Sequence, residues 1–270
     1  MYLQLRRRLQ SITNRIPAII AIGVIILLWY ILSVTNVVPS YMLPSPVDVF
    51  NAFTEDFDLL IRHAGVTITE AFYGLFIGIA FAFVLATVMD RWSFMYKALY
   101  PVMIITQTIP TIAIAPLLVL WMGFEMEPKI TLVAITTFFP IAVGLLDGYK
   151  SVDRDYIDLM RAMGAGRYKI FLYVKMPAAL PHFFSGLKVS TSYAVVGAVI
   201  SEWLGGFEGL GVYMTRVKKA YAFDRMFAVI ILIVVISLLL MVFVDVIKKL
   251  VMPWLKVESL KSRTNKEQKE

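Results

Sequence analysis

Six apolar stretches, each long enough to cross a lipid bilayer as a helix, follow one another along the 270-residue chain. About 20 apolar residues in helical form span the hydrocarbon core, and a helix satisfies its own backbone polar groups there. The pattern therefore predicts an all-α membrane protein with six transmembrane helices. The stretches cover residues 17–38, 66–89, 98–122, 130–146, 183–204 and 226–246.

Composition agrees with this class and excludes others. Hydrophobic residues make up 59% of the chain and charged residues 17%, against roughly 45–50% and about 25% in soluble domains. A soluble enzyme, a disordered chain and a fibrous chain are therefore excluded. The sequence has no cysteine and two histidines, His63 and His182, which argues against disulfides, thiolate chemistry and a zinc site. We expect no metal and no nucleic-acid partner, and attribute the net charge of +7 to cytoplasmic loops.

Loop charges orient the spans. The N-terminal segment, residues 1–16, carries four arginines and no acid, so we expect it in the cytoplasm. Residues 17–250 then form the transmembrane domain, with the first span as an uncleaved anchor. Six spans return the tail, residues 251–270, to the cytoplasm, and its mixed charges predict disorder. One predicted outer loop does not fit the positive-inside rule, because it contains Arg216, Lys218, Lys219 and Arg225.

The loop at residues 147–181, predicted to be cytoplasmic, is the most informative segment. Val152, Tyr156, Met160 and Met163 recur at helical spacing and predict a short helix with an apolar stripe. Ser151 or Asp153 is suited to cap its start, and Gly164 and Gly166 to end it. A second short helix is predicted over residues 167–176, ended by Pro177. Such a stripe docks into a partner's groove or packs against the membrane or the protein's own spans; both interpretations stay open.

This loop resembles the EAA loop of ATP-binding cassette (ABC) importer permeases, whose pattern is EAA, three residues, Gly, nine residues, then Ile-x-Leu-Pro. Here the pattern reads Asp158-Leu159-Met160, then Gly164, then Val174-Lys175-Met176-Pro177. The glycine and proline match, whereas the triplet departs from EAA at each position. The segments at 43–50, 177–190 and 201–211 resemble the branch that imports taurine, nitrate, aliphatic sulfonates and thiamine-pyrimidine precursors.

The resemblance implies a type I importer fold with both termini cytoplasmic, in the plasma or inner membrane of a bacterium. It implies a homodimer of two permease copies in lipid, two cytoplasmic ATPase subunits and an extracellular or periplasmic solute-binding protein. The loop then acts as a coupling helix that takes its movement from the ATPase. The residues implied in coupling are Asp158, Leu159, Met160, Met163, Gly164 and Pro177.

The chain is expected to be a pore subunit and not an enzyme. A phosphate-binding loop needs adjacent Gly and Lys, and no such pair occurs. ATP with its magnesium is therefore expected on the partner ATPase, and no cofactor on this chain. The expected cargo is a small polar solute, either an aliphatic sulfonate, taurine or nitrate type or a thiamine-pyrimidine precursor.

Polar residues within the spans suggest a translocation path. Prolines interrupt a polar stretch at 106–116, and residues 190–193 are polar as well. A kink stabilised by threonine hydroxyls, or hydrogen bonding between helices, explains them equally. Gly74 and Gly78 predict close helix packing. The candidate path residues are Gln107, Thr108, Thr111, Ser192, Tyr193 and Glu202.

Ionisable residues near the spans have an ordinary explanation. We expect Glu70 and Glu202 at the outer interface, where water reaches them, and the alternative is a place along the path or at a gate. His182 is expected to be solvated, and Asp245 to pair with Lys248 or Lys249 on its own helix. A second hypothesis, an ion-coupled secondary transporter, would use Glu70 and Glu202 as coupling sites. An intramembrane enzyme lacks paired catalytic groups.

Overall fold

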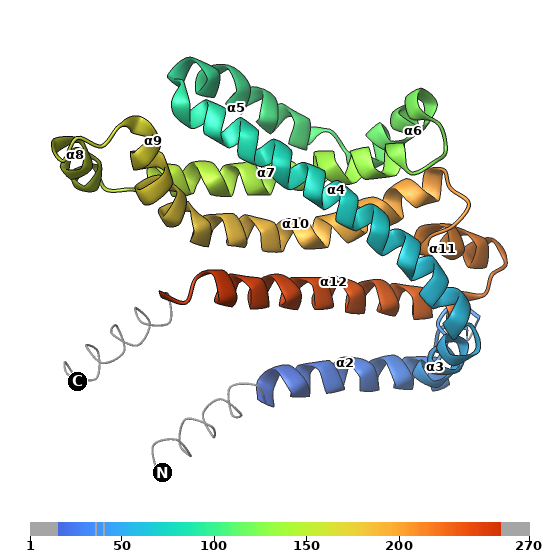
Figure 1. Ribbon diagram of the computed structural model, residues 1–270. Helices are drawn as coiled ribbons and strands as arrows, with labels where there is room; N and C mark the ends of the chain where they lie inside the picture. The colour runs from blue at the N-terminus through green and yellow to red at the C-terminus, as the bar shows by residue number, and fades with distance from the viewer. Residues whose placement is uncertain (1–15, 36, 40, 255–270) are drawn as a thin grey trace, which may run out of the picture. The chain divides into compact units, whose positions relative to one another are not determined.

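The computed structural model describes residues 16–35, 37–39 and 41–254, and every regular element in these ranges is helical (Figure 1). Five helices are long and apolar enough to span a membrane, and a bent pair makes up to six. The predicted all-α membrane fold is confirmed. The predictions of a cytoplasmic N-terminal segment and a disordered tail concern residues that lie almost wholly outside the described ranges.

The five single-helix spans are α2 (Ile16–Val34), α4 (Phe57–Arg91), α7 (Glu127–Lys150), α10 (Met176–Leu204) and α12 (Phe223–Val251). The last four extend beyond the predicted apolar stretches because helical hydrogen bonding continues where side chains are polar. The first ends earlier than predicted, at Val34, ahead of Pro39, and proline disfavours helix in the residue before it.

The remaining predicted span is broken. It consists of α5 (Ser93–Thr108) and α6 (Thr111–Met122), whose axes differ by 98°. Ile109 between them is extended, as expected for a residue before proline. The hydroxyls of Thr106 and Thr108 donate to the carbonyls of Met103 and Ile105 at 2.7 and 2.8 Å. These bonds match the kink interpretation of the polar stretch.

The chain forms two compact units. The first holds residues up to 61 together with 214–232. In it, α3 (Pro46–Glu55) begins with a capping box between Ser45 and Asp48. Trp29 of α2 stacks on Phe227 with ring centroids 5.7 Å apart, and its indole N–H donates to the carbonyl of Pro44 at 3.0 Å. The second unit holds residues 62–213 and those from 233 onward, and it contains every predicted site residue.

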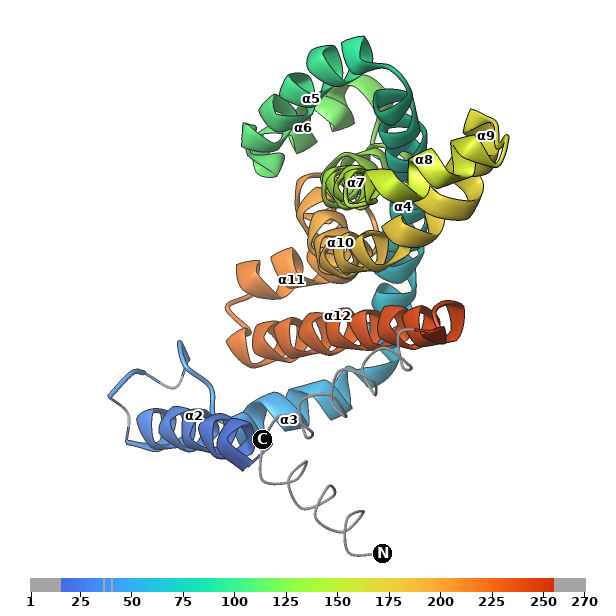
Figure 2. The same cartoon turned by 90° about the vertical axis from the view of Figure 1, so that its left-hand side faces the viewer.

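The centre of the second unit is the pair α7 and α10, which lie side by side (Figures 1 and 2). A Cβ at Gly148 would lie 2.5 Å from the Cα of Ala179, and one at Gly144 would lie 2.7 Å from the carbonyl oxygen of His182. A Cβ at Gly74 of α4 would likewise lie too close to the side chain of Val133 on α7, at 2.4 Å from its Cβ. The predicted close packing at Gly74 and Gly78 is confirmed, and these contacts make the interior rigid.

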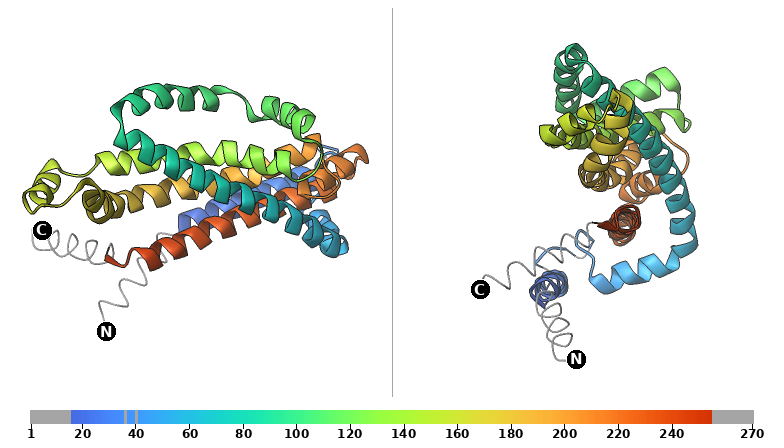
Figure 3. Two further views of the ribbon diagram at one scale, coloured as in Figure 1. Left: turned by 45° about the horizontal axis from the view of Figure 1, so that its top comes forward. Right: turned by 60° about the vertical axis from the view of Figure 1, so that its left-hand side comes forward.

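Three short elements follow α7 and lie at one end of the α7–α10 pair (Figure 3): α8 (Arg154–Ala162), α9 (Arg167–Ile170) and the π-helical turn η1 (Phe171–Lys175). The prediction that Pro177 ends a helix is wrong. Pro177 lies inside one helical run that continues from α9 through η1 into α10, and the π-helical turn directly before it accommodates the missing N–H.

Candidate functional site

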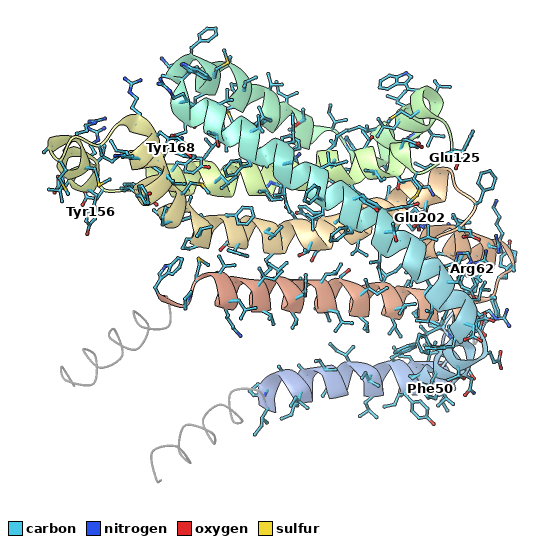
Figure 4. The ribbon with its side chains drawn as sticks, viewed as in Figure 1. Phe50, Arg62, Glu125, Tyr156, Tyr168 and Glu202 are labelled. Carbon is cyan, nitrogen blue, oxygen red and sulfur yellow. The ribbon has the colours of Figure 1, made fainter. Side chains whose placement is uncertain are left out.

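The second unit has two ends that differ in character (Figure 4). Tyr156 and Tyr168 lie at one end, and Arg62, Glu125 and Glu202 lie at the other. We call these the α8 end and the Glu202 end. Trp92 before α5 borders a hollow at the α8 end, and Phe124 after α6 borders one at the Glu202 end. The bent pair therefore runs from one end of the second unit to the other.

The turn after α8 has the predicted geometry. The backbone N–H of Asp155 donates to the carboxylate of Asp153 at 3.1 Å, so Asp153 caps the helix. Gly164 has a φ of +79°, and the N–H groups of Gly164 and Ala165 donate to carbonyls of the last turn at 2.9 Å each. Gly164 as a left-handed stop is confirmed. Gly166 is the N-cap of α9 with a φ of −69°, so the prediction of a second stop there is wrong.

The apolar residues of this loop divide into two sets. Tyr156, Leu159 and Met163 are 63%, 59% and 74% exposed, and their spacing puts them on one side of α8. We call them the α8 face. Met160 is half-buried, and Val152 precedes the helix. The predicted stripe therefore differs in its membership, because the helix begins at Arg154, after Val152, and Leu159 is more exposed than Met160.

A hollow of about 770 Å³ separates α8 and α9 from the end of α4. Ile157 and Arg161 of α8 line it, with Asp90 of α4 and Lys175 of η1. Asp158 pairs with Arg161 at 2.9 Å, and both side chains are about two-thirds exposed. Pro177 is also exposed. The loop thus presents an apolar face and an exposed carboxylate, with space behind the helix.

Two of the predicted path residues meet in one groove. Gln107 of α5 and Tyr193 of α10 line a groove of about 480 Å³ together with Asp147, His182 and Ser185. His182 is exposed, as predicted. The rest of its lining is mostly apolar, so these five polar side chains are set in an apolar surface to which α5, α7 and α10 each contribute.

The other path candidates lie elsewhere. Ser192 contacts the sulfur of Met241 on α12 at 3.2 Å, and neither Thr108 nor Thr111 borders the groove. The neighbouring Ser190 is buried and donates to the carbonyl of Thr137 on α7 at 2.7 Å. Adjacent residues of a helix point about 100° apart, so the polar residues at 190–193 face different neighbours. Tyr193 lines the groove, Ser190 bonds to α7 and Ser192 contacts α12.

Glu70 and Glu202 are not at a watery interface, and that prediction is wrong. Their residues are 0% and 2% exposed, and Lys129 of α7, also buried, donates to Glu70 at 2.8 Å. The placement is explained by pairing, since ionisable groups within a bundle turn inward when a partner is present. Glu202 is therefore not open to the groove.

The carboxylate of Glu202 belongs to a buried network with Thr67 and His63 of α4. Thr67 donates to Glu202 at 2.7 Å, and the N–H of Gly211 donates to Glu202 at 2.6 Å. The N–H groups of Leu210 and Gly209 donate to Thr67 and His63 at 2.9 Å each. Three consecutive backbone donors at the start of α11 (Leu210–Lys219) are thus satisfied by buried side chains.

Gly209 shows why glycine is required in this network. Its φ is +126°, and an added Cβ would overlap the carboxylate of Glu202. Sequence reasoning missed the network. The available signal was the spacing of His63, Thr67 and Glu70, which are polar at i, i+4 and i+7 in an otherwise apolar helix.

Two further ion pairs join different helices. Lys175 donates to both carboxylate oxygens of Asp90 at 2.7 and 2.8 Å, and their side chains are only 21% and 16% exposed. Asp245 of α12 pairs with Lys188 of α10 at 2.6 Å. The prediction that Asp245 pairs with Lys248 or Lys249 is wrong, because a cation on the neighbouring helix lies closer.

The fold and these sites define a multi-span transport permease, with a groove between spans that holds five polar side chains and an exposed helix in a loop between two spans. The chain belongs to the family of binding-protein-dependent transport system inner membrane components, whose model matches residues 74–257. It is thus a permease subunit of an ABC importer and a multi-pass protein of the bacterial inner membrane. The ion-coupled alternative is not favoured.

Relatives agree with this assignment. A probable ABC transporter permease protein of Haemophilus influenzae is 35% identical, with 84% of this chain and 93% of the relative covered. The formylaminopyrimidine transport permease protein ThiX of Halalkalibacterium halodurans is 34% identical over 80% of this chain and 87% of its own. A putative aliphatic sulfonates transport permease protein, SsuC of Bacillus subtilis, is 28% identical over 86% and 85%.

A solved structure has the same fold. The MetNI methionine ABC transporter in an inward-facing conformation matches with a TM-score of 0.64 and 20% identity. The match covers 72% of this chain and 97% of that one. At this identity the likeness concerns the fold alone.

Proposed function

We propose that α8 is the coupling helix of this permease and that its face, Tyr156, Leu159 and Met163, docks into a groove of a cytoplasmic ABC ATPase. The observation that carries the proposal is this exposed apolar face on a helix held by the left-handed turn at Gly164. An apolar face at i, i+3 and i+7 is the pattern by which a helix fills a partner's groove. Asp158 adds an exposed carboxylate beside it, suited to a basic rim.

The complete importer in this proposal has two copies of the permease as a homodimer, two ATPase subunits that bind ATP with magnesium, and an extracellular solute-binding protein. The permease itself holds no cofactor. The α8 end is then cytoplasmic and the Glu202 end faces the binding protein. ATP-driven closure of the ATPase pair moves α8 and opens the pore to alternate sides.

Co-purification tests the docking. The variant with Tyr156, Leu159 and Met163 all changed to serine is expected to lose the ATPase during affinity purification, because each change removes apolar area from the contact. The matched control is Leu239→Ser, which alters an exposed apolar residue of α12, a helix that is not part of the loop. Equal recovery of ATPase with the triple variant and the control would contradict the docking role.

We infer that the solute is an uncharged or weakly basic heterocycle of the aminopyrimidine type and not a sulfonate or nitrate. The groove offers an amide, a phenol, a hydroxyl, an imidazole and the carboxylate of Asp147. Among the described residues that line it, none is Lys or Arg, the partners that anions require. The formylaminopyrimidine permease is also more similar to this chain than the sulfonate permease is.

Uptake by the whole importer tests the solute class. The permease, produced together with its ATPase and solute-binding protein, is expected to take up labelled formylaminopyrimidine in an ATP-dependent way. Gln107→Ala and Tyr193→Ala are expected to slow this uptake, whereas Thr108→Ala, outside the groove, is the matched control. Uptake of taurine in place of the pyrimidine would overturn the assignment of the solute and leave the ATPase docking unaffected.

A further inference from the structure

Helices α4 and α10 are tied together by polar contacts near both ends of α10. At the α8 end, Lys175 donates to Asp90 at 2.7 and 2.8 Å. At the opposite end, Thr67 donates to Glu202 at 2.7 Å, and both residues are almost fully buried. Each tie joins the same two helices.

The element between the ties is one continuous helical run. The run from α9 through η1 into α10 is helical without interruption from Arg167 to Leu204, a length of 38 residues. Positions 175 and 202 are therefore about 40 Å apart at 1.5 Å per residue. Movement applied at one end of such a helix is carried to the other end as a rigid-body displacement.

Each tie also contacts an element outside the two helices. Lys175 is the last residue of η1, the π-helical turn through which α8 and α9 connect to α10. Such turns are rare and concentrate at functional sites. At the far tie, Glu202 and Thr67 accept the N–H groups of Gly211 and Leu210, so they hold the segment at 205–211.

We propose that α4 and α10 form one frame, closed by Asp90–Lys175 at the α8 end and by Thr67–Glu202 at the other, through which displacement of α8 reaches the segment at 205–211. Asp90 and Lys175 are then positioning residues for transport. This inference rests on the proposed function, because the ATPase supplies the displacement of α8.

The geometry separates this role from a merely stabilising one. A half-buried ion pair loses much of its Coulomb energy to dehydration, so its net contribution to stability is small. The two-pronged contact of Lys175 with Asp90 nevertheless fixes the distance between two helices. Lys175→Met alone leaves the carboxylate of Asp90 unpaired and also lowers stability, so the readout is the transmission of movement in the importer that assembles and not the amount of folded protein.

Spin labels test the transmission in the assembled importer. The chain has no cysteine of its own, so Ala162→Cys on α8 and Phe207→Cys at the far end can each be labelled without background. Pulsed EPR measures the distance between the two copies with and without ATP and vanadate. Both distances are expected to change in the parent protein. In Lys175→Met, the ATP-dependent change in the distance between the labels at position 162 is expected to persist. The corresponding change in the distance between the labels at position 207 is expected to fall at least twofold.

Three variants make the result decisive. Lys175→Arg keeps the pair and is expected to retain the change at 207, and Lys169→Met, an exposed lysine of α9, is the matched control. Thr67→Val opens the other tie and should reduce the change at 207 even where Lys175→Met fails to assemble.

The outcomes distinguish the two proposals. An unaltered change at 207 in both Lys175→Met and Thr67→Val would overturn the frame and leave the coupling role of α8 standing. A label at 162 that does not respond to ATP in the parent protein would overturn the coupling role, and the frame with it.

Discussion

The two ends of the second unit differ in which side chains are buried and which are exposed. At the Glu202 end, charged and polar groups are buried and paired within the chain, including Glu70 with Lys129 and Glu202 with Thr67. At the α8 end, three large apolar side chains are exposed and a hollow lies behind them. At the Glu202 end the buried charges find partners within this chain, whereas at the α8 end a large apolar face is left exposed. Removing one partner of a buried charge should therefore lower stability, whereas substitutions of the α8 face should change the coupling to the ATPase.

The largest expected effect is at the buried ion pair. Lys129→Met leaves Glu70 as an uncompensated buried charge and is expected to lower the free energy of unfolding by about 3–5 kcal/mol. The double variant Glu70→Leu with Lys129→Met removes both charges and should recover most of this loss. Denaturant unfolding of the purified chain in detergent measures both. A single variant as stable as the parent would contradict the pairing.

Glycines on α4 give the next largest effect. Gly74→Ala brings a Cβ against Val133 and within 2.9 Å of the carbonyl oxygen of Ile130, so a loss of about 1–3 kcal/mol is expected. Gly65→Ala has no atom within 4 Å of the added Cβ and should gain up to about 1 kcal/mol from helix propensity. Denaturant unfolding compares Gly74→Ala with Gly65→Ala. If both variants changed the free energy of unfolding in the same direction, the close packing of Gly74 against α7 would be refuted.

The sequence was a good guide where one physical signal dominates. Apolar length located the spans, and the need for a left-handed residue located the stop at Gly164. Of the six residues predicted for the path, Gln107 and Tyr193 line the groove, and their role in transport stays a prediction. Each of these inferences depends on local chain chemistry.

The errors have a different cause. Glu70 was assigned to water because its partner, Lys129, is 59 positions away, and Asp245 was paired with its own helix for the same reason. The prediction that a helix ends at Pro177 is wrong because the π-helical turn η1 lets the helix continue past this proline. A single sequence does not identify the partner of a long-range pair, even where the spacing of His63, Thr67 and Glu70 marks a polar face on α4, and it does not mark a π-helical turn.

The turn after α8 provides a test with little effect on global stability. Gly164→Ala forces a side chain into φ of +79° and is expected to cost about 1–2 kcal/mol, confined to the loop. Uptake per ATP hydrolysed should fall, because α8 loses its orientation. Gly166→Ala, at a φ of −69°, is the matched control. A normal uptake ratio in Gly164→Ala would exclude an orienting role for this turn.

The smallest effect is expected at Asp158, where exposure weakens every electrostatic contribution. Asp158→Lys frees Arg161 from its exposed pair and reverses the charge beside the α8 face. The affinity for the ATPase should fall by about 1 kcal/mol or less, roughly fivefold, at low salt. The loss should vanish at high salt, where exposed charges are screened. Asp155→Lys makes the same charge change one turn earlier, so an equal loss in both variants would indicate net charge and not a contact at position 158.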